Sequence, residues 1–215
     1  MWGSDLEKRE FGRLYPLFNG SQGERSPARG IQAVKRLAGN GYVPAIFQLG
    51  QAYFDHLGVR RSYPEAFRLY LQAAQAGYPS AECGVGNFYA MAFPRHEACE
   101  YDASQAVDWW RRAAEHGNPG AQCNLAGYLL QGTGVDKDPA EAYLWAALAV
   151  HCSTIRFRSA EVFRDQSSAQ LREADREECE LRITALKERL PLGWSDHLVY
   201  WKKLFDAARG EGASP

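Results

Sequence analysis

Apolar residues recur at fixed offsets in three stretches of the chain. In the clearest copy, which starts at Ala121, large apolar residues follow at plus four and plus eight and a glycine follows at plus eleven. Apolar residues also hold plus four and plus eight in the copies that start at Ala45 and Ala81. Steps of three and four residues between apolar positions are typical of an amphipathic helix. Each copy therefore predicts one helix that packs on one face.

A second helix is predicted in the later half of each copy. Ala66, Ala106 and Ala142 each have a large apolar residue three positions later and a small alanine seven positions later. Between the two helices of the last copy, Gly132-Thr-Gly-Val135 favours a turn that ends one helix. Asp138-Pro139 then favours the start of the next helix. Each copy is thus predicted to be a helix–turn–helix unit.

The spacing of the copies predicts how these units are assembled. Thirty-six residues separate Ala45 from Ala81, and forty separate Ala81 from Ala121. This period is typical of stacked helical repeats, in which each unit is too small to bury its apolar face alone. We expect three units within 43–152, at 43–78, 79–118 and 119–152, and an all-α fold without strands.

Four short motifs carry the pattern: Ala121-Gln-Cys-Asn-Leu125, Gly132-Thr-Gly-Val135, Ala142-x-x-Trp145 and, in the preceding unit, Ala113-Ala114-x-x-Gly117. Together they resemble the Sel-1-like repeat, a relative of the tetratricopeptide repeat. The resemblance covers about residues 30–150 well and the segment to about residue 185 loosely. It implies an α/α solenoid, a right-handed superhelix of stacked helix–turn–helix repeats. It also implies a bacterial scaffold or adaptor that binds another protein.

The flanking segments are predicted to be helical as well. Residues 1–42 are expected to form an amino-terminal cap or incomplete repeat, in which Ser26-Pro27 starts a helix. Residues 153–208 are expected to form a C-terminal helical extension, with one helix starting from a capping box near Ser167. Residues 209–215 are expected to be a disordered tail.

An aromatic stretch near the C-terminus allows three interpretations. Trp194, Tyr200, Trp201 and Phe205 lie close together after a possible helix cap at Ser195. We favour a helix that covers the open apolar face of the last unit, because a solenoid requires such a cap. A dimer contact and a lid over the chain's own groove remain alternatives. The expected state is a monomer or weak dimer.

Composition narrows the possible partners. The 215 residues carry a net charge of −1 and a pI near 6.5, which does not favour a general nucleic-acid binder. The chain starts without a secretory signal pattern, and no stretch is apolar enough to predict a membrane span. The odd number of cysteines, with Cys83 and Cys123 at packing positions, favours reduced thiols and a cytoplasmic location.

The first helix of each unit has one arc that is poor in charge. On a helical wheel this arc holds positions plus three, six, seven and ten, and its side chains are mainly amides and aromatics. Amides hydrogen-bond to a peptide backbone, and aromatic rings add apolar contact area. We therefore predict that the concave face binds a peptide or helix of a partner protein. The predicted partner-binding residues are Gln48, Gln51, Asp55, Asn87, Phe88, Met91, Asn124, Tyr128 and Gln131.

One of these positions is also supported by the resemblance to tetratricopeptide repeats. In those relatives an asparagine just before the plus-four leucine often clamps a bound peptide, and Asn124 holds that place. The alternative is a purely structural role, in which these residues are only polar surface or Phe88 and Tyr128 pack on each other. The longer loop of the second unit offers further contacts through Arg95, His96, Cys99 and Tyr101, or is only a tolerated insertion.

Two chemical alternatives are weaker. His96-Glu-Ala-Cys99 and His151-Cys152 suggest a zinc site, but their spacing is unlike a CxxC motif and they lie in different units. Some secreted relatives bind or slowly hydrolyse β-lactams, yet no serine here has a lysine three residues later. We predict no catalytic residues, no metal and no cofactor.

Overall fold

The computed structural model describes residues 7, 9–11, 27–91, 98–153 and 158–190. These residues form helices joined by turns and contain no strand, so the predicted all-α class is confirmed for this part of the chain. The part of the predicted amino-terminal cap that precedes Pro27 lies largely outside these ranges. The loop residues Arg95 and His96 and the aromatic stretch from Trp194 to Phe205 also lie outside them.

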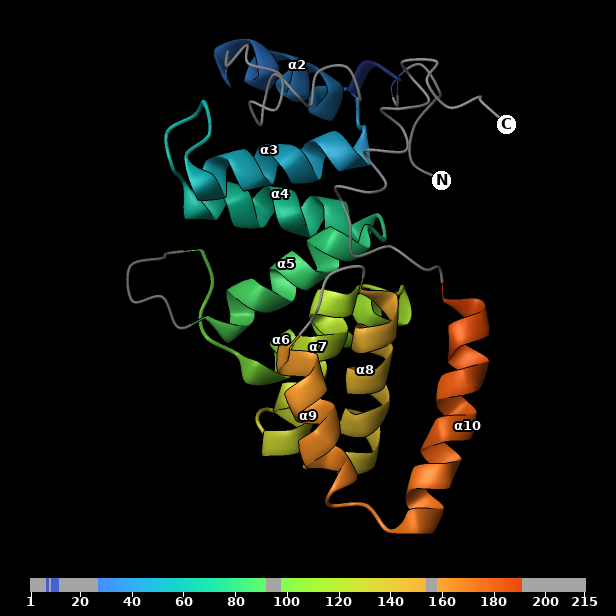
Figure 1. Cartoon of the computed structure of the whole chain (residues 1–215). Coiled ribbons are helices and arrows are strands. Elements are labelled where there is room, and N and C mark those ends of the chain that lie inside the picture. Colours follow the sequence, from blue (N-terminus) through green and yellow to red (C-terminus); the bar gives the residue numbers. More distant parts are fainter. Residues whose placement is uncertain (1–6, 8, 12–26, 92–97, 154–157, 191–215) are drawn as a thin grey trace, which may run out of the picture. The chain divides into compact units, whose positions relative to one another are not determined.

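The chain divides into two compact units, and the first contains the described residues up to Ala81. Helices α2 (Pro27–Gly39), α3 (Val43–Asp55) and α4 (Tyr63–Gln75) lie side by side in it (Figure 1). Its core is aromatic: Phe47 stacks on Tyr70 with ring centroids 5.1 Å apart and lies 5.3 Å from the ring of Tyr78. Because apolar side chains of both α3 and α4 point into this core, the two helices form the first repeat pair.

The second unit contains the described residues from Glu82 to Met91 and from Glu100 to Leu190. Helix α5 (Pro79–Ala90) starts in the first unit and continues here. It is followed by α6 (Ala103–Glu115), α7 (Pro119–Gln131), α8 (Pro139–Cys152), α9 (Arg158–Ser168) and α10 (Glu173–Arg189). Helix α9 packs against α7 and α8, and α10 packs along α8 (Figure 1). One apolar core runs through α6, α7 and α8 and includes Cys179 and Ile183 of α10.

The turn between α7 and α8 forms as the sequence predicts. Helix α7 ends at Gly132, which adopts a left-handed φ of 74°, and Gly134 has a φ of 69°. Asp138 caps α8 by accepting the backbone N–H of Glu141 at 2.9 Å. Glycine reaches the left-handed region at low cost, which explains its place at the turn.

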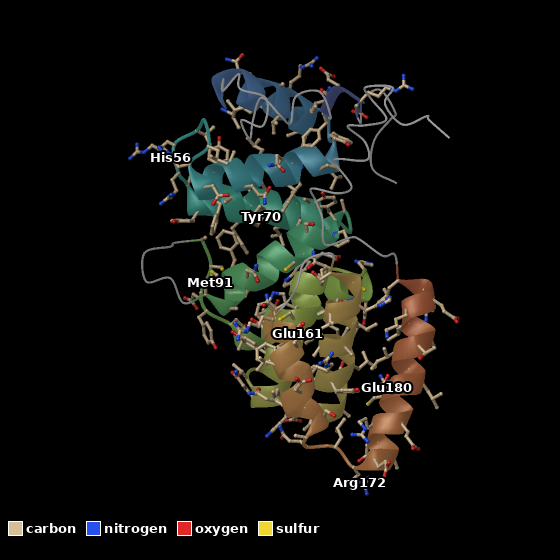
Figure 2. All side chains as sticks on the ribbon, in the orientation of Figure 1. His56, Tyr70, Met91, Glu161, Arg172 and Glu180 are labelled. Atoms are coloured by element: carbon tan, nitrogen blue, oxygen red, sulfur yellow. The ribbon has the colours of Figure 1, made fainter. Side chains whose placement is uncertain are left out.

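In the first repeat a histidine follows the first helix, at the position that glycine holds after α7. His56, labelled in Figure 2, adopts a φ of 63° in the αL region after α3. Its Nδ1 accepts the backbone N–H of Arg61 at 3.1 Å, which holds the loop against the helix end. This hydrogen bond offsets part of the cost of a left-handed residue that carries a Cβ.

Each helix pair is closed by the same backbone hydrogen bond. The N-cap residue of the second helix donates its N–H to the carbonyl at plus eight of the first helix. The three bonds are Ser62 to Tyr53 at 3.1 Å, Asp102 to Tyr89 at 3.0 Å and Asp138 to Leu129 at 3.0 Å. The longer loop of the second repeat therefore returns to the same closing point as the other two.

A glycine at plus five of the first helix allows close contact with a ring from the second. A Cβ on Gly50 would lie 2.6 Å from Cδ1 of Tyr70, and one on Gly86 would lie 2.6 Å from Cδ1 of Trp110. Tyr70 lies on α4, as Figure 2 shows. The third repeat instead has buried alanines, Ala126 and Ala146, at the two equivalent positions.

The predicted capping box near Ser167 is wrong. Ser167 is fully buried inside α9, where its hydroxyl donates to the carbonyl of Phe163 at 2.7 Å. Helix α10 begins later, at Glu173, and its N-cap residue Arg172 makes no capping hydrogen bond through its side chain. Packing of α9 against α7 and α8 therefore outweighs the local capping preference of the serine.

Candidate partner-binding surface

The candidate surface is built around Trp110, which points from α6 toward α5. The indole is 2% exposed and lies against Gly86, where the absence of a side chain lets the ring approach the helix backbone. This contact brings the indole N–H to Asn87, the next residue on α5. Helix–helix packing thus places a hydrogen-bond donor at a fixed position beside an amide side chain.

Two asparagines from consecutive repeats meet at this indole. Trp110 Nε1 donates to Asn87 Oδ1 at 3.0 Å, and Asn124 Nδ2 on α7 donates to the same oxygen at 2.9 Å. Both asparagine side chains are partly buried. Since these bonds join α5, α6 and α7, they hold both amides in one orientation.

The chemistry of the indole determines which amide atoms remain available. An indole N–H only donates, so Asn87 must present its oxygen to it. Asn124 must then present its NH₂ group to that oxygen. Within the described residues, neither Nδ2 of Asn87 nor Oδ1 of Asn124 has a hydrogen-bond partner. The pair therefore keeps one amide donor group and one carbonyl acceptor for a ligand.

Aromatic rings continue this surface. Tyr128 of α7 packs edge-on against Trp110, with ring centroids 4.7 Å apart. Burial raises the pKa of the Tyr128 hydroxyl, and the neighbouring Tyr101 raises it further, so the hydroxyl stays a neutral donor. Tyr101 is 52% exposed. An amide pair is thus bordered by flat apolar area.

The structure separates the nine predicted residues into groups. Asn87, Asn124 and Tyr128 come together around Trp110, and Met91 and Gln131 are exposed on the same unit. Figure 2 shows Met91 just beyond the end of α5. The other predicted residues behave differently. Gln48 and Phe88 are each only 4% exposed, while Gln51 is partly exposed and Asp55 exposed on α3 of the first unit.

Burial of Gln48 and Phe88 changes the candidate surface. A side chain with 4% exposure has almost no area left to contact a partner, so we leave both residues out of the surface. The helical wheel placed them correctly relative to their own helix, but the neighbouring helices cover these positions. Trp110 is the residue that the sequence did not single out. A signal for it was present: a glycine at plus five of the first helix faces a bulky aromatic residue of the second helix. The same pairing occurs between Gly50 and Tyr70.

An acidic residue is buried at the start of this unit. Glu82 on α5 is 3% exposed and its Oε2 lies 2.8 Å from Nδ1 of His116, which follows α6. Burial raises the pKa of this carboxyl, and the contact with His116 opposes that rise. The pair links the first turn of α5 to the end of α6.

The cysteines and histidines form no metal cluster within the described residues. All five cysteines are free, and burial raises the pKa of the Cys83 thiol to about 12 and of the Cys123 thiol to about 11. Thiols that resist deprotonation are poor nucleophiles and poor metal ligands. His96 of the weak zinc motif lies outside the described residues.

The paired helices, the shared closing bond and the recurring small residues define a helical repeat protein. A model of the Sel1 repeat matches residues 43–78, 79–118 and 119–152. The chain therefore belongs to the Sel1 repeat family, as its motifs predicted, and it has the all-helical solenoid-type fold of that family.

This chain is also similar to individual proteins. Chitin synthase regulatory factor 3 of Schizosaccharomyces pombe is 32% identical over 136 residues, which are 60% of this chain and 14% of that protein. A Sel1 repeat protein from Oxalobacter formigenes aligns over 71% of this chain and 98% of its own, with 28% identity and a TM-score of 0.49.

A third comparison supports the fold. A protective antigen present in uropathogenic Escherichia coli strains aligns over 96% of this chain and 48% of its own, with 18% identity and a TM-score of 0.58. This chain thus spans a small part of its fungal relative and about half of the antigen. Among the described helices, none is both long and apolar enough to cross a membrane.

Proposed function

We propose that this protein is a non-enzymatic scaffold or adaptor that binds a segment of another protein on the surface formed by α5, α6 and α7. The observation that carries the proposal is the oriented amide pair of Asn87 and Asn124 beside Trp110. A peptide group has one C=O and one N–H. The free NH₂ of Asn87 and the free carbonyl of Asn124 are complementary to those two groups.

The surroundings favour an extended peptide with apolar side chains. Tyr128 and Tyr101 offer flat rings, and Met91 is 45% exposed beyond the end of α5. Aromatic and methionine side chains are common at protein interfaces because they adapt to apolar partners at modest entropic cost. Gln131, which is exposed at the end of α7, extends the surface with one more amide.

Two further observations support this function. Sel1 repeats generally mediate protein interactions, and a relative of this chain carries the name of a regulatory factor. We infer that the bound partner is a protein whose activity or location this chain regulates. Five free thiols favour a reducing compartment, so we also infer a cytoplasmic location. Gln51 and Asp55 of the first unit stay predicted contacts on α3.

The proposal is tested by crosslinking and affinity measurements. A photoreactive amino acid at Met91 should crosslink a partner in cells, whereas the same group at Leu181, 74% exposed on α10, should not. The segment identified in this way is then titrated into purified protein. Asn124→Ala should weaken binding about tenfold, because one hydrogen bond to a peptide group is lost.

A matched control separates binding from folding. Glu188→Ala alters an exposed residue of α10 and should leave both the affinity and the unfolding temperature unchanged. If Asn124→Ala binds as tightly as the wild type while its fold is intact, the proposed surface is wrong. Turnover of a β-lactam reporter by the wild type would contradict a non-enzymatic function.

A further inference from the structure

A cavity of about 540 Å³ lies between α8, α9 and α10, apart from the α5–α7 surface. One wall comes from Tyr143, Ala147, Val150 and His151, which follow one another along one face of α8. Spacings of four and three residues place Tyr143, Ala147 and Val150 on one stripe, and His151 lies beside it, four residues after Ala147. Helix α10 provides the opposite wall through Glu180, Ile183 and Lys187.

The two ends of the cavity differ in charge. At one end the Tyr143 hydroxyl donates to the carboxylate of Glu180, the residue labelled on α10 in Figure 2. Arg164 also lines the cavity, and its Nη2 lies 2.8 Å from Oδ1 of Asp165. The acidic and basic groups at this end are therefore already paired.

The other end of the cavity is lined by Lys187 of α10 and His151 of α8. Lys187 lies seven residues after Glu180, which corresponds to roughly 10 Å along α10. Within the described residues Lys187 makes no ion pair, and His151 makes no hydrogen bond through its ring. Burial lowers the pKa of His151, and the nearby Lys187 lowers it further, so a neutral imidazole accompanies the ammonium group.

Apolar side chains line the wall of the cavity between these ends. Ala147 and Val150 of α8 are partly exposed in the cavity, and Ile183 of α10, which is buried, lies behind its opposite wall. A ligand that suits this cavity has one negative charge at one end and a short apolar body. A second negative charge is disfavoured because Glu180 already lies at the opposite end.

We propose that this cavity binds a small monocarboxylate, whose carboxylate contacts Lys187 and His151 and whose short apolar body lies on Ala147 and Val150. The ligand is either a free small molecule or the C-terminal carboxylate of a peptide, since both present the same group. This site is independent of the α5–α7 surface, so either proposal can fail without the other.

The test is an NMR titration of the full chain with hexanoate as the probe. The ring resonances of His151, assigned with a His151→Gln variant, should shift in a saturable manner. The pKa of His151 should rise on binding, because a carboxylate stabilises the imidazolium form. Hexanol and hexylammonium have similar apolar bodies without a carboxylate, and they should not produce this saturable shift.

Variants at Lys187 distinguish binding from nonspecific effects. Lys187→Met keeps the length of the side chain and removes its charge, so hexanoate should bind about tenfold more weakly. Lys187→Arg should bind nearly as well as the wild type. Lys137→Met, an exposed residue of the α7–α8 turn, is the matched control and should show no change.

The outcomes decide the proposal. Absence of saturation, equal binding of hexanol, or unchanged affinity of Lys187→Met would overturn it. A short acetylated peptide that ends in leucine, with a free or an amidated C-terminus, is tested in parallel. If only the peptide with a free C-terminus binds, and binds more tightly than hexanoate, the ligand is a chain terminus. If this peptide binds more weakly than hexanoate, the ligand is a free small molecule.

Discussion

Gly86 of α5 faces the indole of Trp110 of α6 so closely that the glycine has no room for a side chain. A Cβ there would lie 2.6 Å from Cδ1 and 2.7 Å from Nε1 of the indole, and 3.1 Å from the carbonyl oxygen of Ala106. The contact places the indole N–H at Asn87 and so determines the geometry of the candidate surface. The packing of α5 against α6 within one repeat therefore also orients the amides of the candidate surface.

Gly86→Ala should destabilise the protein by about 1–3 kcal/mol, because the added methyl group forces the buried indole and the helix backbone apart. Urea unfolding followed by circular dichroism measures the loss. Gly39→Ala is the matched control, since a Cβ on Gly39 would meet nothing within 4 Å. The control should be neutral or slightly stabilising, because alanine loses less backbone entropy than glycine on folding. Equal effects of both changes would contradict the close contact.

Asn87→Ala should cost more stability than Asn124→Ala. Loss of Asn87 leaves the buried Trp110 N–H without its acceptor, and an unpaired buried donor costs about 1–3 kcal/mol. Loss of Asn124 leaves the Asn87 oxygen still bonded to the indole. A double-mutant cycle with Trp110→Phe, which removes the N–H, should recover much of the Asn87→Ala penalty. Additive effects would show that the two side chains are not coupled.

Glu82→Gln should stabilise the protein at neutral pH and flatten its stability profile in acid. Burial raises the native pKa of this carboxyl above its unfolded value, so the native state binds the proton more tightly. The buried carboxylate therefore lowers the free energy of unfolding by its full amount above the native pKa. This penalty disappears as the pH falls through the native pKa. Urea midpoints at several pH values for both proteins give the difference. If the wild type loses more stability than Glu82→Gln on acidification, this prediction is wrong.

His56→Gly should be more stable than His56→Ala by about 1 kcal/mol, because only glycine adopts the left-handed conformation without strain. Both variants lose the hydrogen bond from the Arg61 N–H, so that loss cancels in the comparison. Thermal unfolding of the two variants provides the measurement. Equal stabilities would indicate that the loop relaxes out of the left-handed region.

The sequence predicted the helix pairs well because their ends are encoded locally. Gly132 and Asp138 each specify a backbone conformation or a cap through their own chemistry, and the structure has both. Ser167 failed as a cap because burial inside α9 is a tertiary effect. Local rules therefore predicted the end of α7 and the start of α8, whereas they failed where Ser167 is buried by neighbouring helices.

The candidate site was less predictable because it depends on neighbours distant in sequence. The Asn87 and Asn124 amides are 37 residues apart and bond to each other, and the Trp110 indole that bonds to Asn87 was not marked as important by the offsets alone. A helical wheel also treats Phe88 and Tyr128 alike, yet only Tyr128 keeps exposed area. The wheel describes one helix, and these exposures depend on which helices lie next to it.

The recurring hydrogen bond from the N-cap residue to the plus-eight carbonyl has an evolutionary consequence. Asp102 reaches Tyr89 across twelve intervening residues, whereas Asp138 reaches Leu129 across eight, and the bond length is 3.0 Å in both cases. Segments of different length are thus interchangeable between the same two anchor points. Natural selection is free to diversify these connections without shifting the register of the helices that carry them.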